Sequence, residues 1–199
     1  MVTARQLNTA GWVAVSNAIL MVPVLVLTVV LGMQEPEAGF AARLAGALLS
    51  CVASALCVYI MITLRDLLGE RYNFHEVDGI ISMLVYVNVA FSALELLSSV
   101  SSAATDVVGV ISLFVIVFVG IVCIVFGIKL LRLGDDLYGM RQPFSYLSIA
   151  TGFCFATVFL MPAGLLTSSI ADVVLAIIFF RAVDAPEAPN ALGPDRQER

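Results

Sequence analysis

Four long apolar stretches separated by short polar segments constrain this chain more than any other feature. Each stretch exceeds 20 residues, and a helix needs about 20 residues to cross the roughly 30 Å hydrocarbon core of a bilayer. Hydrophobic residues make up 61% of the 199 positions, whereas soluble domains have about 45–50%. The sequence therefore predicts an all-α integral membrane protein. The four stretches cover residues 10–32, 39–67, 78–100 and 106–131.

A fifth apolar stretch, residues 144–183, is too long for a single crossing. As one helix it would measure about 60 Å, twice the thickness of the hydrocarbon core. Pro162 and Gly164 lie near its midpoint, and this combination is a strong helix breaker. The pattern predicts two short spans, 144–161 and 165–183, and thus six transmembrane helices. A re-entrant hairpin is the alternative.

The basic residues are distributed asymmetrically over this six-span arrangement. Nine of the ten fall on one side, and only Arg43 falls on the other. Because cytoplasmic segments retain Lys and Arg whereas translocated loops are depleted of them, both termini are expected in the cytoplasm. The nine are Arg5, Arg65, Arg71, Lys129, Arg132, Arg141, Arg181, Arg196 and Arg199.

The chain has room for one domain, which we place at residues 1–184. Residues 185–199 carry three prolines and mixed charge, which predicts a disordered cytoplasmic tail. The first apolar run is too long for the roughly 7–15 residue core of a signal peptide, so we expect it to be retained. The chain lacks a basic run with interleaved aromatics, which argues against nucleic-acid binding.

A nine-residue pattern, D-L-x-G-x-R-x-x-F, occurs twice, at residues 66–74 and 136–144. Both copies would lie on the same side, which predicts a parallel repeat of a helical hairpin. The glycine can end a helix, the arginine can bind freed carbonyls, and the phenylalanine can anchor the next span at the membrane interface. Alternatively the loops also form a docking surface for a partner protein. The matched positions are Asp66, Gly69, Arg71, Phe74, Asp136, Gly139, Arg141 and Phe144.

Polar residues within the apolar stretches are candidates for a site. A stripe on the third stretch must face other helices or a cavity, because lipid penalises polar side chains. Asn17 in the first stretch and Asp172 in the last are further candidates. The stripe consists of Asn88, Ser92, Glu95, Ser99 and Ser102.

The exceptional Arg43 predicts an ion pair with Glu95 or Asp172, because all three would lie in the outer half of the membrane. For Asp172, the spacing Ser169-x-x-Asp172 also fits a helix-capping box with no further role. Glu95 has no such geometry, so a structural ion pair and an ion or proton site both stay open.

Small residues recur at four-residue spacing on two stretches and share one face of a third, as is typical of closely packed membrane helices. These faces predict that residues 39–67, 106–131 and 144–161 form the centre of the bundle. The residues at four-residue spacing are Ala42, Gly46, Ser50 and Ser54, and then Ser148, Gly152 and Ala156. Those on one face of residues 106–131 are Gly109, Ser112, Gly120, Cys123 and Gly127, with Ile116 interrupting them.

Known catalytic and metal-binding motifs are missing from the sequence. There is a single histidine and no C-x-x-C pair among four cysteines, so we expect no metal, no cofactor and no enzymatic activity. We read the cysteines as small apolar packing residues. They are Cys51, Cys57, Cys123 and Cys154.

These observations favour a non-enzymatic scaffold or partner-binding membrane protein that uses the duplicated loops. The alternative is a small channel or transporter in which Glu95 handles a cation or proton, with Asp172 and Asn17 lining the path. A lipid-binding groove beside Pro23 is a third hypothesis. Composition is typical of a bacterial inner-membrane protein, and besides the lipid bilayer a homo-oligomeric partner is compatible with the sequence.

Overall fold

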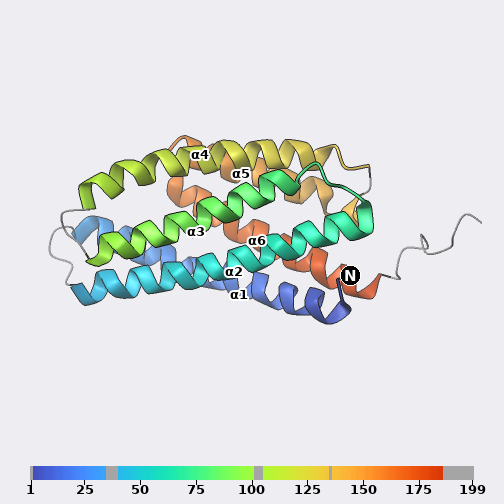
Figure 1. Ribbon diagram of the computed structural model, residues 1–199, viewed down its shortest axis with the longest axis horizontal. Coiled ribbons are helices and arrows are strands. Elements are labelled where there is room, and N and C mark those ends of the chain that lie inside the picture. Colours follow the sequence, from blue (N-terminus) through green and yellow to red (C-terminus); the bar gives the residue numbers. More distant parts are fainter. Residues whose placement is uncertain (1, 35–39, 101–104, 135, 186–199) are drawn as a thin grey trace, which may run out of the picture.

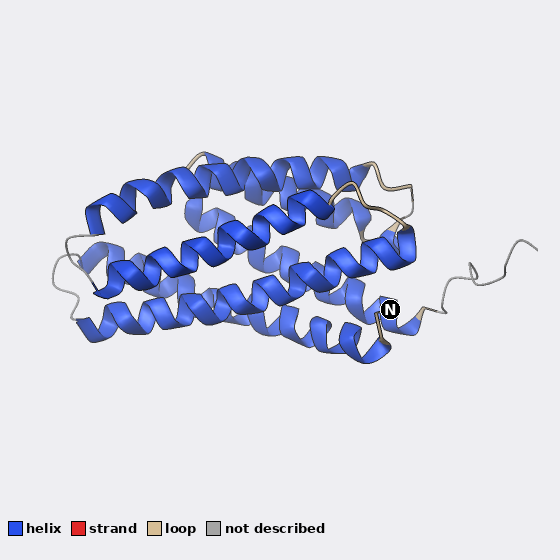
Figure 2. Cartoon of the chain, viewed as in Figure 1, coloured by secondary structure: helices blue, strands red, loops and turns tan. Residues whose placement is uncertain are grey.

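The computed structural model describes residues 2–34, 40–100, 105–134 and 136–185, with side chains described outside 27–43 and 97–107. Within these ranges the chain is helical and has no strand (Figure 2). Six α-helices and one short 3₁₀ helix follow one another. They are α1 (Ala4–Gln34), α2 (Phe40–Tyr72), α3 (Asp78–Val100), α4 (Thr105–Leu131), η2 (Leu137–Gly139), α5 (Arg141–Ala156) and α6 (Met161–Asp184).

The six α-helices form a closed ring (Figure 1). Each packs against the helices before and after it in sequence, and α6 closes the ring by packing against α1. The pairs α4–α5 and α1–α6 have the most extensive contacts. Within the described chain α2 contacts neither α4 nor α5, so the predicted centre made of these three helices is wrong.

Five of the helices are long and apolar enough to cross a membrane, as in an integral membrane protein. The exception is α5, whose 16 residues extend only about 24 Å at 1.5 Å per residue. It is therefore shorter than the roughly 30 Å hydrocarbon core. The fold thus confirms a helical membrane bundle.

The break between α5 and α6 occurs before the position predicted from Pro162. The chain turns at residues 157–160, where Val158 has a φ of 54°. Pro162 lies in the first turn of α6, where a proline is tolerated because no helical partner is lost for its missing N–H. Gly164 lies inside α6, and a Cβ there would be 2.7 Å from the Phe155 ring.

Two helices extend further than hydropathy alone predicted. The first begins at Ala4 rather than at residue 10, and α2 continues to Tyr72 rather than stopping at residue 67. Asn73 follows α2 with a φ of 49°, a left-handed conformation that asparagine tolerates at helix ends. Hydropathy reports the apolar part of a helix, whereas backbone hydrogen bonds continue beyond it.

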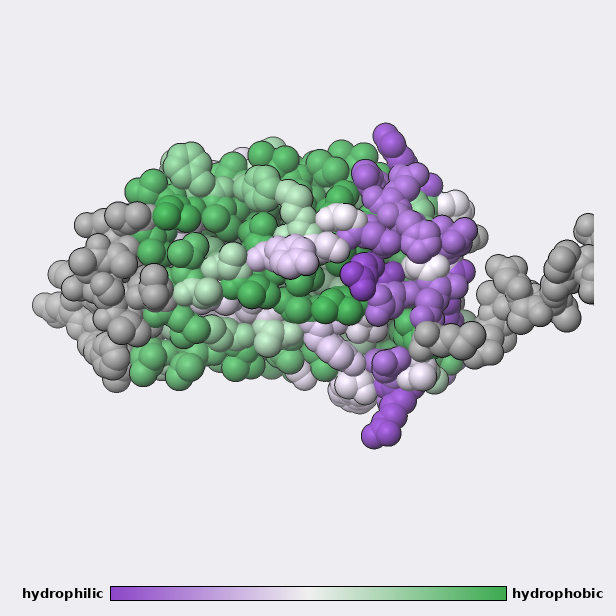
Figure 3. Space-filling view, viewed as in Figure 1, coloured by the Kyte–Doolittle hydropathy of each residue, from purple (hydrophilic) through white to green (hydrophobic). Residues whose placement is uncertain are grey.

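One end of the bundle collects the basic residues whose side chains are described. This charged end contains the start of α1, the end of α6, and the segments 73–77, 132–134 and 136–140 (Figure 1). Figure 3 shows a hydrophilic band there and an apolar surface along the adjoining helices. We call the other end of the ring the opposite end. The described basic residues at the charged end are Arg5, Arg65, Arg71, Lys129, Arg132, Arg141 and Arg181.

A cluster of large buried side chains fills the half of the ring nearest the charged end. All six helices contribute, and within the cluster Phe126 packs edge-to-face on Phe144 with ring centroids 6.2 Å apart. Its larger members are Leu7, Ile60, Leu64, Leu67, Leu68, Ile81, Phe126, Leu130, Leu137, Phe144, Leu175, Ile178 and Phe179. Buried apolar side chains therefore fill the interior of this half of the bundle.

Small residues bring α4 and α5 into backbone contact. A Cβ added to Gly120 would be 2.6 Å from the carbonyl oxygen of Gly152, and one added to Gly127 would be 2.8 Å from that of Ser145. These distances leave no space for a side chain. Gly120, Gly127 and Gly152 thus confirm the small-residue faces predicted for these two helices, whereas a Cβ on Gly109 would meet nothing within 4 Å.

Candidate intramembrane polar site

A polar pair links α1 to α6 near the middle of the bundle. The Asn17 side-chain amide donates a hydrogen bond of 2.7 Å to an oxygen of the Asp172 carboxylate. Asn17 is only 1% exposed, and Asp172 is half-buried. The close packing of the two helices brings these residues together, and it is aided at Gly11, which lies against the Phe180 ring.

The second polar atom of the Asn17 side chain has no protein partner. Its Oδ1 is buried and makes no hydrogen bond, although buried amide oxygens are normally paired. An acceptor without a donor therefore lies beside the carboxylate of Asp172. We call Asn17 and Asp172 the α1–α6 polar pair.

Ser169 strengthens the same helix contact. Its hydroxyl donates a 2.9 Å hydrogen bond to the backbone oxygen of Ala18. Ser169 and Asp172 lie well inside α6, which begins at Met161. The capping-box interpretation of these two residues is therefore wrong, because both side chains bind α1 and neither caps a helix.

Cys57 on α2 lies within electrostatic range of Asp172, and it lies within the same range of Cys123 on α4. Both thiols are half-buried. Sequence reasoning treated the two cysteines only as packing residues, and nothing in their spacing indicates that Cys57 lies near Asp172.

The stripe on α3 faces α2. The Ser54 hydroxyl donates to Asn88 Oδ1, and the Ser50 hydroxyl donates to the Glu95 carboxylate. Ser92 donates to the backbone oxygen of Asn88 at 3.1 Å. The stripe thus turns inward to a neighbouring helix, as expected; Ser99 and Ser102 lie outside the described side chains.

Glu95 and Asp172 belong to different helix pairs. Ser54, which binds Asn88, lies within one turn of Cys57, the α2 neighbour of Asp172. Glu95 follows Asn88 by seven residues, which is about 10 Å along a helix, toward the opposite end. We call Asn17, Cys57, Asn88, Cys123 and Asp172 the polar layer.

Arg43 lies near the start of α2, and its side chain is outside the described set. The predicted ion pair of Arg43 with Glu95 or Asp172 therefore falls on a side chain that the structure does not describe, and it stays a prediction.

The two loops with similar sequences contact each other at the charged end. The Arg71 guanidinium donates a 2.7 Å hydrogen bond to the Tyr138 hydroxyl, and the Tyr72 and Tyr138 rings meet edge-to-face at 6.3 Å. Arg181 donates to the Tyr138 backbone oxygen at 2.6 Å. The aromatic rings therefore hold the loops together.

Equivalent positions in the two loops have different structural roles. Gly69 lies inside α2, whereas Gly139 has a φ of 81°. Arg141 donates to the Leu133 backbone oxygen, as expected of an arginine that binds freed carbonyls. Phe144 is buried in the core instead of lying at the membrane interface.

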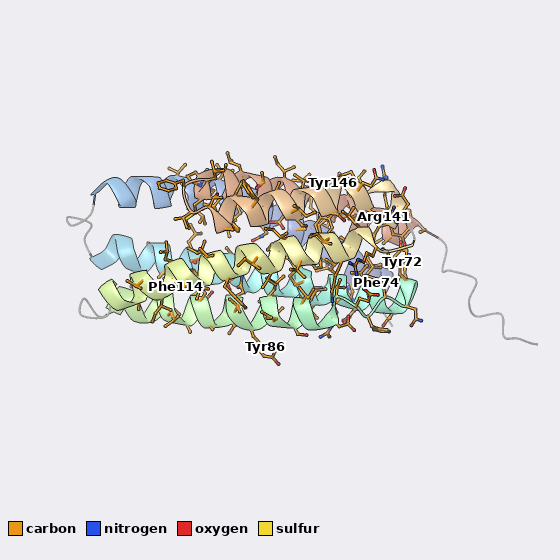
Figure 4. The ribbon with its side chains drawn as sticks, turned by 90° about the horizontal axis from the view of Figure 1, so that it is seen from above. Tyr72, Phe74, Tyr86, Phe114, Arg141 and Tyr146 are labelled. Atoms are coloured by element: carbon orange, nitrogen blue, oxygen red, sulfur yellow. The ribbon has the colours of Figure 1, made fainter. Side chains whose placement is uncertain are left out.

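Other side chains at the charged end are more exposed. Figure 4 shows Tyr72, Phe74 and Arg141 gathered there, whereas Tyr86 points away from the bundle. Asp66 makes a 3.2 Å salt bridge with Arg65, while Asp136 is exposed. These residues cap and join helices, and the carboxylates of Asp66 and Asp136 are not buried.

The described residues contain no group of three His, Cys, Asp or Glu side chains able to hold a metal ion. Comparisons with protein-family models, with curated proteins and with solved structures return no match. The class of protein therefore follows from the fold: a bundle with five helices long and apolar enough to span a membrane. Any function must be argued from the polar pair itself.

Proposed function

We propose that this protein is a small membrane channel or transporter that handles a proton or a monovalent cation at Asp172. The observation that carries the proposal is the carboxylate of Asp172 paired with the buried amide of Asn17 inside an apolar bundle. Ionisable groups within membrane spans are costly, and they commonly mark ion or proton pathways. Asp172 therefore takes the central role that the sequence suggested for Glu95.

The charge of Asp172 supports this proposal. Salt bridges in the described chain join Arg65 to Asp66 and His75 to Asp78, so no described basic side chain is paired with Asp172. A carboxylate removed from water without a cationic partner is strongly disfavoured. A proton or a small cation at this position removes that penalty.

The distribution of packing suggests the route. Large buried side chains lie between the polar layer and the charged end. On the other side of the layer, the described buried apolar residues are small: Ala18, Ala47, Ala53, Val108 and Val122. Cations would thus reach Asp172 from the opposite end, along the α2–α3 face that carries Glu95.

The orientation is part of the proposal. We place the charged end in the cytoplasm, because basic residues are retained on that side. Both ends of the chain would then be cytoplasmic, with α5 and α6 as the fifth and sixth crossings. A parallel hairpin repeat and a bacterial inner membrane remain part of the same hypothesis.

Partner binding through the duplicated loops has weaker support. Docking surfaces commonly present exposed aromatic residues, but Tyr72 and Tyr138 contact each other and Arg71 binds Tyr138. The loop residues are thus engaged within the chain. We retain the scaffold only as the outcome that follows if no cation flux is measured.

Flux measurements on the purified chain in proteoliposomes test the proposal. A gradient of H⁺, Na⁺ or K⁺ is applied across vesicles containing the wild type, Asp172→Asn or Glu95→Gln, and ion movement is followed with fluorescent indicators. We expect flux in the wild type and its loss in Asp172→Asn. The amide is neutral, so it neither takes up a proton nor balances the charge of a cation. Glu95→Gln should reduce the rate without abolishing flux.

The matched control is Asp66→Asn, which removes a carboxylate at the charged end and should leave flux unchanged. All variants must elute from size-exclusion chromatography as the wild type does. Absence of flux in the wild type for every ion, or equal flux in Asp172→Asn, contradicts the proposal.

A further inference from the structure

We infer that the α1–α6 polar pair binds an alkali metal cation of the Na⁺ class between the carboxylate of Asp172 and Oδ1 of Asn17. This inference rests on the proposed function and names the ligand of the same site. Its starting point is the unpartnered, buried Asn17 Oδ1 next to a carboxylate.

Charge balance selects a monovalent ion. Asp172 is the one carboxylate of the polar layer, and the thiols of Cys57 and Cys123 are neutral in their protonated form. A single positive charge makes the site neutral. A divalent cation would leave a net charge in the interior of the bundle, which apolar surroundings disfavour.

Asn17 Oδ1 can be satisfied in two ways, by a proton on Asp172 or by a cation. A protonated Asp172 carboxyl would donate its O–H to Oδ1 while the amide nitrogen donates to the other carboxyl oxygen, and binding of ²²Na⁺ distinguishes the two occupants. Hard cations prefer carboxylate, amide and carbonyl oxygens. A bound cation would satisfy both oxygens at once.

Nearby oxygens can extend the set of ligands. The Ser169 hydroxyl hydrogen is directed at the Ala18 backbone oxygen, which leaves the lone pairs of the hydroxyl oxygen available. Ser169 precedes Asp172 by almost one helical turn, so the two share a face of α6. The thiols are softer and suit alkali cations poorly.

Thermal unfolding of the full-length chain in detergent tests the site. NaCl is titrated against choline chloride at constant ionic strength, and the unfolding midpoint is recorded. A ligand that binds only the folded state raises stability in proportion to ln(1 + [L]/Kd). We expect a rise of the midpoint with NaCl for the wild type and for the control Asp66→Asn, and no rise for Asp172→Asn.

A direct measurement keeps the test independent of the folding of variants. Binding of ²²Na⁺ to the wild type should saturate at a single ion per chain and weaken as the pH falls, because protons compete for the carboxylate. Absence of saturable binding, or an equal rise of the midpoint in Asp172→Asn, overturns the cation site.

The inference and the proposed function fail in distinguishable ways. Proton flux that depends on Asp172, combined with no effect of NaCl on the midpoint and no bound ²²Na⁺, overturns the cation site while the proposed function stands. Saturable Na⁺ binding without any flux supports the site and contradicts the proposed function.

Discussion

Asn17 combines two properties that are rarely found together in a membrane helix. It is almost completely buried, and only one of its two polar atoms is hydrogen-bonded within the described structure. Apolar or small residues would make a purely structural contact between α1 and α6 without the free-energy cost of burying a polar side chain. The pairing of Asn17 with Asp172 therefore favours a ligand as the reason for an amide at this position.

Replacement of Asn17 measures the energy of the pair. Asn17→Leu removes the amide that donates to Asp172 and leaves the carboxylate buried without that partner. Interhelical hydrogen bonds in membranes contribute about 0.6 to 1.7 kcal/mol, and an unsatisfied buried group costs about 1–3 kcal/mol. We expect a loss of about 1–2 kcal/mol in the free energy of unfolding in mixed detergent micelles.

Ser92→Ala is the matched control. Its hydroxyl bonds to the backbone of its own helix, so we expect a change within about 0.5 kcal/mol. Equal losses in the two variants would show that the Asn17–Asp172 bond contributes nothing specific.

At the scale of single elements, the shared surface of α4 and α5 has the least tolerance for added atoms. The backbones touch at Gly120 and Gly152, where a Cβ on Gly152 would be 2.5 Å from the Gly120 carbonyl oxygen. This contact fixes α5 against α4, although α5 is shorter than the roughly 30 Å hydrocarbon core of a bilayer.

Gly152→Ala should therefore push α4 and α5 apart. Overpacking of this kind costs about 1–3 kcal/mol, which chemical unfolding in detergent can measure. Gly109→Ala on α4 is the control, since a Cβ there meets nothing within 4 Å. A Gly152→Ala protein as stable as the control would contradict the close approach.

Spacing in the sequence was informative where it concerned a single helix. Small residues on one face of each helix correctly predicted the close approach of α4 and α5 at Gly120, Gly127 and Gly152, and the polar stripe correctly predicted that Asn88 and Glu95 turn inward. Spacing cannot reveal which helix lies opposite. Asn17 and Asp172 are 155 residues apart, so their pairing was not predictable.

Other errors have equally local causes. Ser169 and Asp172 match the spacing of a cap, but a cap also requires a helix start, and the turn at 157–160 moves that start to Met161. The repeated loop pattern predicted that Phe74 and Phe144 both anchor a span at the membrane interface. Phe144 is instead buried in the core, where it packs against Phe126. Tertiary contacts override both patterns.

At the scale of the whole molecule, the ring of helices is asymmetric. The half toward the charged end is filled by large buried side chains, and the polar layer lies at the inner boundary of that half. Both Glu95 and Arg43 lie beyond the layer, toward the opposite end. This arrangement supports the proposal that the site is reached from the opposite end, because the large buried side chains lie on the charged side of the layer.

The reactivity of Cys57 tests this arrangement most directly, because its thiol belongs to the polar layer and lies within electrostatic range of Asp172. The other three cysteines are replaced by alanine, and the protein is reconstituted in vesicles of one orientation. A small, charged, membrane-impermeant thiol reagent is then added to one side at a time. We expect modification of Cys57 from the side of the opposite end, slowed by NaCl, and none from the charged end. Modification from the charged end alone, or from neither side, would contradict a cation site open to the opposite end.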